Sequence, residues 1–203
     1  MRRVYIMILV SLCFVSGFCA EQQPLAKEVF KKRSTLYHEN GILQQCKLKK
    51  PCIVQGYPCE RWVRFHDSGA IKQFQLSETR TIQDIPFPVH STVFLHPDGS
   101  LRSCYFSKDI TVRGLPLNGG YMKVMTAFDR NGRISFCCLS RPTEIHGIPC
   151  AASVLKPVYL YPSGKLKKCS LSRAHSLDRK EYKKGTTLEF ETNGSLKSTE
   201  SEK

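Results

Sequence analysis

The chain has 203 residues, of which 41% are hydrophobic and 24% are charged, and this composition excludes a disordered chain, a collagen and a protein with many membrane spans. Its 31 Lys and Arg outnumber 17 Asp and Glu, which gives a formal net charge of +14. Ten cysteines are many, but they are too few for a small domain held together mainly by disulfides.

Residues 1–20 have the composition of an export signal. Two arginines lie within residues 1–3, an apolar stretch covers 4–15, and small residues follow at 16–17. Three alternatives stay open: a cleaved secretory signal, a lipoprotein signal with lipid on Cys19, and an uncleaved N-terminal anchor. All three predict an exported protein, located in the periplasm, at the outer membrane or outside the cell. Cleavage lowers the net charge to +12 and leaves eight cysteines, an even number that permits full pairing in an oxidising compartment.

A lead-in follows at 21–35, with a short helix expected over 24–33, and an internal repeat fills residues 36–197. Six dipeptides of hairpin-turn type, each ending in glycine, recur at intervals of 28, 30, 33, 32 and 30 residues. Asn, Asp or Ser precedes the glycine, and such pairs close two-residue hairpins with positive φ at both positions. The turn glycines are Gly41, Gly69, Gly99, Gly132, Gly164 and Gly194.

Apolar positions around each turn glycine define the repeat unit. In five copies they lie two, five and seven residues after the glycine, as in Leu101, Cys104 and Phe106. The three-residue step breaks the alternation of a strand and predicts a β-bulge. Four copies end in a β-branched residue, a short turn and a proline, as in residues 112–116. The sequence predicts an all-β fold, an array of stacked antiparallel β-hairpin repeats with about five full units plus a capping hairpin, and a disordered tail at 198–203.

These strand–turn–strand units resemble bacterial MORN-type hairpin repeats. They resemble more closely the repeats of about 30 residues, with the pattern hydrophobic-x-Phe-x-Pro-x-Gly-x-Leu, found in exported bacterial proteins. MORN units are shorter and rich in Tyr and Trp, whereas Trp62 is the single tryptophan of this chain. The resemblance covers residues 36–197 and implies a stacked β-hairpin architecture without enzymatic activity.

The cysteines recur at related positions of the units. Cys46 and Cys59 are separated by thirteen residues, as are Cys137 and Cys150. One interpretation is a disulfide in each pair, and the other is the packing of small apolar thiols. The remaining cysteines of the mature chain pair irregularly or stay reduced, and they are Cys52, Cys104, Cys138 and Cys169.

Three histidines, His38, His66 and His96, lie three residues before consecutive turn glycines. Equivalent atoms of stacked hairpins would be about 10 Å apart, which is too far for shared metal ligation, so we interpret this as a solvated position beside the turn. The sequence predicts no metal site and no cofactor, and it contains no nucleophile elbow, zinc-protease motif or phosphate loop.

Positive charge gathers in two runs of lysines, in different phases of the repeat. It protects strand edges from aggregation, or it binds an anionic envelope component or an acidic protein. Export disfavours nucleic acid, and membrane association is expected only through the N-terminus. The predicted function is a non-enzymatic structural or interaction module of a bacterial cell envelope, and the alternative is an exported hydrolase with a site across the repeats. The candidate anion-binding residues are Lys47, Lys49, Lys50, Lys165, Lys167 and Lys168.

Overall fold

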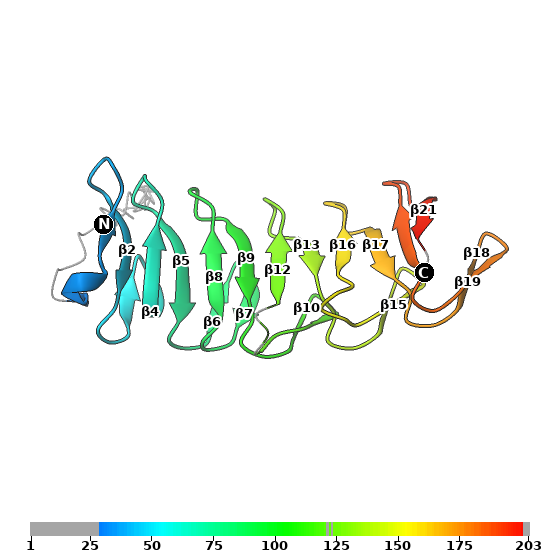
Figure 1. Cartoon of the computed structure of the whole chain (residues 1–203), viewed down its shortest axis with the longest axis horizontal. Coiled ribbons are helices and arrows are strands. Elements are labelled where there is room, and N and C mark those ends of the chain that lie inside the picture. Colours follow the sequence, from blue (N-terminus) through cyan, green and yellow to red (C-terminus); the bar gives the residue numbers. More distant parts are fainter. Residues whose placement is uncertain (1–28, 121, 123, 201–203) are drawn as a thin grey trace, which may run out of the picture.

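The computed structural model of the chain describes residues 29–120, 122 and 124–200 (Figure 1), so the predicted signal at 1–20, with Cys19, lies outside the described residues. The described part of the lead-in holds a short 3-10 helix, η2 (Lys32–Ser34). The rest is an elongated array of antiparallel strands, as the repeat predicts. No helix of the described ranges is long and apolar enough to cross a membrane.

Twelve strands form the main sheet as six hairpins side by side, and each hairpin turns at one of the predicted glycines. A further strand, β3 (Cys52–Val54), pairs with the beginning of the third of these strands, β4. In spatial order the twelve strands are β1 (Leu36–Tyr37), β2 (Leu43–Lys47), β4 (Tyr57–Phe65), β5 (Ile71–Leu76), β8 (Thr92–Leu95), β9 (Leu101–Tyr105), β12 (Met125–Phe128), β13 (Ile134–Cys137), β16 (Val158–Leu160), β17 (Leu166–Ser170), β20 (Thr187–Phe190) and β21 (Leu196–Glu200).

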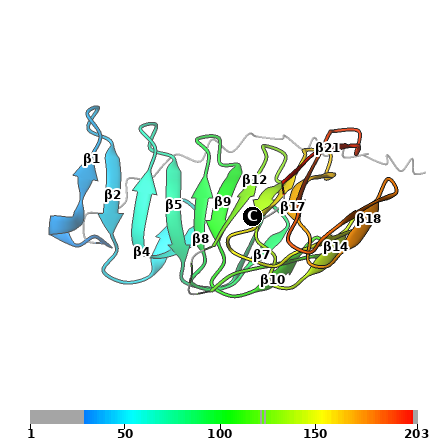
Figure 2. The same cartoon turned by 45° about the vertical axis from the view of Figure 1, so that its right-hand side comes forward.

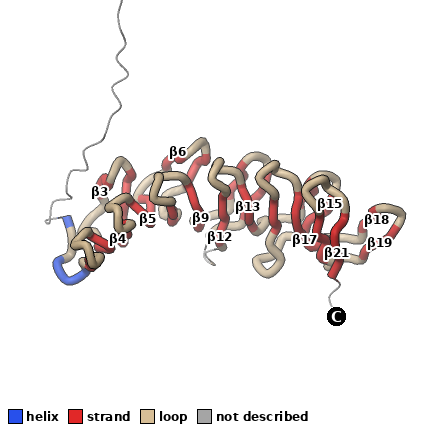
Figure 3. Tube along the Cα trace, turned by 90° about the horizontal axis from the view of Figure 1, so that it is seen from above, coloured by secondary structure: helices blue, strands red, loops and turns tan. Residues whose placement is uncertain are grey.

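Small hairpins form a second layer along one face of the main sheet (Figures 2 and 3). The first is made by β3 with the start of β4. The others are β6 (Arg80–Ile82) with β7 (Ile85–Phe87), β10 (Ile110–Val112) with β11 (Leu115–Leu117), β14 (Thr143–Ile145) with β15 (Ile148–Cys150), and β18 (His175–Leu177) with β19 (Lys180–Tyr182).

The turn glycines close their hairpins with a type I turn and a bulge. The amide of Gly99 donates to the His96 carbonyl at 3.0 Å. Gly99 has φ +81, whereas the φ of Asp98 is negative. The register then passes from Leu95↔Leu101 to Phe94↔Ser103, so one residue is extra. The same skip occurs in all six hairpins, which confirms the predicted bulge.

Two-residue turns with positive φ at both central positions occur in the small hairpins instead. Arg113 and Gly114, for example, have φ of 48° and 82°. The expectation of such turns at the six main glycines was therefore wrong, because there a single left-handed glycine follows a type I turn.

The core lies between the two layers. Phe74, Phe87 and Phe106 are its largest fully buried side chains, and the rings of Phe87 and Phe106 stack with centroids 5.2 Å apart. Because each small hairpin packs against the next unit, the units stabilise one another. At the far end β21 reaches Glu200, so residues 198–200, expected in the tail, belong to the array.

Candidate functional site

The main sheet has one face that the small hairpins do not cover, called here the outer face. Side chains alternate along each strand, so β8 buries Val93 and Leu95 in the core and turns Thr92 and Phe94 outward. An uncovered sheet face with aromatic side chains is the feature of this chain that most resembles an interaction surface.

Two aromatic pairs stand on the outer face. Phe94 packs edge to face against Tyr105 with ring centroids 5.4 Å apart, and Phe136 packs in the same way against Tyr159 at 5.2 Å. The register joins them through small residues, in the order Phe94↔Ser103↔Ala127↔Phe136. Three strand spacings separate the two pairs by about 14 Å.

The six bulges add outward side chains beside this row. The extra residue stands three positions after each turn glycine, and four of the six are cationic. They are Gln44, Lys72, Arg102, Ser135, Lys167 and Lys197. The guanidinium of Arg102 lies 5.7 Å from the ring centroid of Phe94, and Lys167 Nζ lies 5.5 Å from that of Tyr161. Neither cation has an ion-pair partner among the described residues, so both charges remain available.

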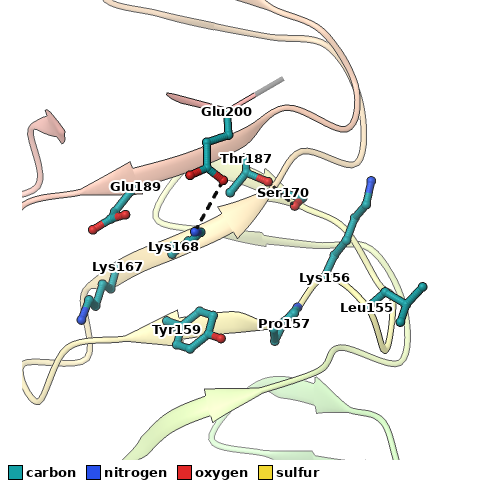
Figure 4. Close-up of a pocket in the computed structure, with 10 residues that line it drawn as sticks. All are labelled: Leu155, Lys156, Pro157, Tyr159, Lys167, Lys168, Ser170, Thr187, Glu189 and Glu200. Carbon is teal, nitrogen blue, oxygen red and sulfur yellow. Dashed lines mark hydrogen bonds and ion pairs between the residues drawn. The ribbon is translucent and has the colours of Figure 1, made fainter. Parts of the chain in front are cut away.

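A hollow of about 530 Å³, called here the C-terminal hollow, opens on the outer face over β16, β17, β20 and β21 (Figure 4). Tyr159, Lys167 and Lys168 form its floor, and the loop that carries Leu155 forms one wall. Lys168 Nζ lies 3.8 Å from a Glu200 carboxylate oxygen, so a carboxylate already approaches this ammonium.

A second hollow of about 500 Å³, called here the N-terminal hollow, lies on the same face beside Tyr105. Arg61 and His90 also line it. Arg61 has φ +61 and belongs to a bulge in β4, and the imidazole of His90 pairs with Glu60. Each aromatic pair therefore has a hollow with a cationic side chain next to it.

The structure separates the two lysine runs that the sequence singled out. Lys167 and Lys168 line the C-terminal hollow, and Lys165 lies in the adjacent turn. Lys47 lies on β2 with Nζ 5.7 Å from the Trp62 centroid, near the opposite end of the sheet.

Lys49 and Lys50 of the first run are exposed between β2 and β3. A search for runs of lysines does not find Lys72, Arg102 and Lys197. Their common position, three residues after a turn glycine, is visible in the sequence.

Two of the three recurrent histidines tie neighbouring units together, which corrects their interpretation as solvated residues. His38 Nε2 donates to the Phe65 carbonyl at 3.2 Å, and His66 Nε2 donates to the Leu95 carbonyl at 3.1 Å. Both rings are half-buried. Tyr161 occupies the same position of a later unit, and its hydroxyl donates to the Phe190 carbonyl at 2.8 Å.

The eight described cysteines are free thiols, so neither Cys46–Cys59 nor Cys137–Cys150 is a disulfide in this structure. These four side chains are fully buried, as the packing interpretation requires. Burial raises the pKa of Cys46 and of Cys137 to about 12, which keeps both protonated at neutral pH.

Cys59 and Cys150 each also have another thiol beside them. In the register of the first small hairpin, the residue opposite Cys59 is Cys52. The thiol of Cys150 hydrogen-bonds with Cys169 of the following unit, and this contact raises the pKa of Cys150. The described residues also contain no group of three or more side chains placed to hold a metal ion.

No family model and no curated protein matches the chain. Among solved structures it is similar to alternansucrase in complex with isomaltotriose, and to truncated alternansucrase from Leuconostoc mesenteroides NRRL B-1355. Each comparison covers 81% of this chain and 12% of the other, at 15% identity and a TM-score of 0.17. The chain thus spans about an eighth of those proteins, and a TM-score this low carries no argument about fold or function.

Proposed function

We propose that this chain is an exported, non-enzymatic interaction module of a bacterial cell envelope, and that its outer face binds an acidic polysaccharide. One observation carries the proposal: the sheet face that the second layer leaves uncovered bears two aromatic pairs, a guanidinium over one ring of the first pair, and a hollow beside each pair. Support for export comes from the composition of residues 1–20.

An acidic polysaccharide combines the two chemistries that this face offers. The faces of sugar rings pack against exposed aromatic rings, while carboxylate or phosphate groups pair with ammonium and guanidinium groups. The two hollows receive substituents that project from a linear chain lying across the strands between them. A flat repetitive face suits an extended polymer better than a compact ligand.

Other anionic partners match this face less well. A flat bilayer cannot enter the two hollows, whereas substituents of a linear polymer can. Nucleic acid offers bases for stacking, but the expected export removes the chain from it. Binding to these partners is therefore an outcome that counts against the proposal.

The test uses the chain from residue 21 and polygalacturonate as the acidic polymer. Trp62 is the single tryptophan and stands on the outer face beside Lys47, so its fluorescence reports binding near one end of the sheet, and calorimetry reports the whole face. We expect binding that weakens with salt, because the Debye length falls from about 10 Å at 0.1 M to about 3 Å at 1 M.

The double variant Arg102→Glu, Lys167→Glu should bind about tenfold more weakly, in line with the loss of two favourable charge contacts. The matched control is Arg113→Glu, Arg179→Glu, which changes the net charge equally at the tips of two small hairpins in the other layer. Equal losses in both variants, or binding indifferent to salt, would contradict the site. Tighter binding to single-stranded DNA or to anionic vesicles would contradict the ligand class, and release of reducing ends would contradict the non-enzymatic role.

A further inference from the structure

We infer that Cys52 and Cys59 are a redox pair that closes into a disulfide across the first small hairpin. The two residues lie directly opposite each other in the antiparallel register, two pairs away from the turn. Gln55 and Gly56 form that turn, with φ of 47° and 81°. Cys52↔Cys59 is a hydrogen-bonded pair of the ladder, with Cα atoms about 5.5 Å apart, within the range that a disulfide spans, and the Cβ atoms must approach by about 1 Å for the bond to form.

The first small hairpin is unusual in having cysteine on both sides. The other four carry different residues at the same cross-strand positions, and these pairs are Arg80↔Phe87, Ile110↔Leu117, Thr143↔Cys150 and His175↔Tyr182. Core packing requires a buried residue on the second strand of each small hairpin, and Cys59 meets that requirement. It does not require a thiol at the opposite position of the first strand, where Cys52 stands. The pairing of two thiols is what distinguishes the first unit.

Exposure gives the two thiols different roles. Cys52 is half-buried, whereas Cys59 and the nearby Cys46 are fully buried. A soluble disulfide such as oxidised glutathione would react first with the Cys52 thiolate, forming a mixed disulfide and releasing one glutathione. Burial raises the pKa of Cys59, so its thiol must lose its proton as the hairpin opens to water. The resulting thiolate attacks the Cys52 sulfur, forms the protein disulfide and releases the second glutathione. Two thiols are oxidised, one glutathione disulfide is reduced, and two protons pass to the leaving thiolates.

The pair lies where a disulfide would stabilise the end of the array. Among the described residues, β3 pairs only with β4, and this hairpin is the first of the second layer, with a neighbouring small hairpin on one side. Terminal units of a repeat array lack the interface that stabilises inner units, so they open first. A disulfide here would hold the end of the array closed. An oxidising compartment would favour it, but the chemistry itself does not depend on the proposed polysaccharide binding.

The test starts from the reduced chain, equilibrated with oxidised glutathione, then alkylated and digested with trypsin. No Lys or Arg lies between Cys52 and Cys59, so their disulfide forms inside one peptide ending at Arg61. Cys46 lies on a different peptide, because trypsin cleaves after Lys47 and Lys49. We expect the internal link, and we expect it to persist in Cys46→Ala. A link between the two peptides, or full alkylation of both thiols, would overturn the inference.

A functional readout separates the bond from a chance oxidation product. Oxidised glutathione should raise the urea midpoint of the wild-type chain and leave that of Cys52→Ser unchanged. Cys104 is buried in an inner unit and serves as the internal control, because its thiol should stay alkylatable after unfolding. Oxidation that does not change the midpoint of the wild-type chain would refute the role as a clamp. Polysaccharide binding is measured separately, so either proposal can fail alone.

Discussion

Gln83 couples one unit of the array to the next, and its removal tests that coupling. The residue stands at the corner of the β6–β7 hairpin with φ +49. Its amide Nε2 donates to the Gly99 carbonyl at 3.1 Å, and its Oε1 accepts from the Leu101 amide at 3.1 Å. Gln83→Ala removes both hydrogen bonds. Alanine and glutamine are about equally unfavourable in a left-handed conformation, so the backbone contributes little to the difference.

Each hydrogen bond contributes about 0.5–1.5 kcal/mol net, so two partly solvated bonds are worth about 1–2 kcal/mol. For an array of this length a loss of 1 kcal/mol lowers Tm by about 2–4 °C. A urea titration gives the change in the free energy of unfolding, provided that the slope is unchanged.

Amide exchange gives a local measure of the same change. The Leu101 amide should exchange faster in the variant. The Ile71 amide donates to Gln55 Oε1 at 2.9 Å in the preceding unit and should keep its protection. Unchanged protection at Leu101, or an equal loss at both amides, would refute the coupling.

Substitutions at three further positions test the turns. His146 occupies the position of Gln83 in a later small hairpin, so His146→Gln should raise the urea midpoint by adding the same amide beside the next turn. Gly99→Ala should cost about 1–2 kcal/mol, because φ is +81 while no atom lies within 4 Å of the new Cβ, and Gly99→Asn should cost less in the same titration. Hydrogen bonds from Ser100, first from its hydroxyl and then from its amide, lower the pKa of Asp98. Stability from this carboxylate is present above its unfolded pKa and is lost as pH falls through the folded value, so Ser100→Ala should raise the pKa in an NMR titration and reduce that acid-side loss.

The fold could be predicted from the sequence because its information is local and repeated. A turn dipeptide about every 30 residues sets the hairpins, and the apolar step from Leu101 to Cys104 locates the bulge. The positions of the hairpins and of the bulge can both be inferred without knowing which distant segments of the chain are in contact. The type of turn was misjudged because Asp-Gly suits both a type I′ turn and a type I turn followed by a left-handed glycine.

Contacts between units could not be predicted in the same way. His66 reaches a carbonyl 29 residues further on, and nothing near the histidine in the sequence indicates that partner. The cysteines show the same limit, because a constant spacing of thirteen residues does not reveal strand register. The register of the small hairpin places Cys52, and not Cys46, opposite Cys59.

The proposed binding face follows from a bulge that recurs in every unit. Beyond the turn the strands pair in step at Leu95↔Leu101, and the next pair is Phe94↔Ser103, so Arg102 is an extra residue without a cross-strand partner. It therefore contributes little to sheet pairing and is free to vary, unlike the buried neighbour two positions after the glycine. At Arg102 and Lys167 the extra residue is a cation over an aromatic ring. Because the bulge recurs with every unit, a repeat selected for stacking also presents one outward position per hairpin, and a row of charge can be assembled there without altering the core.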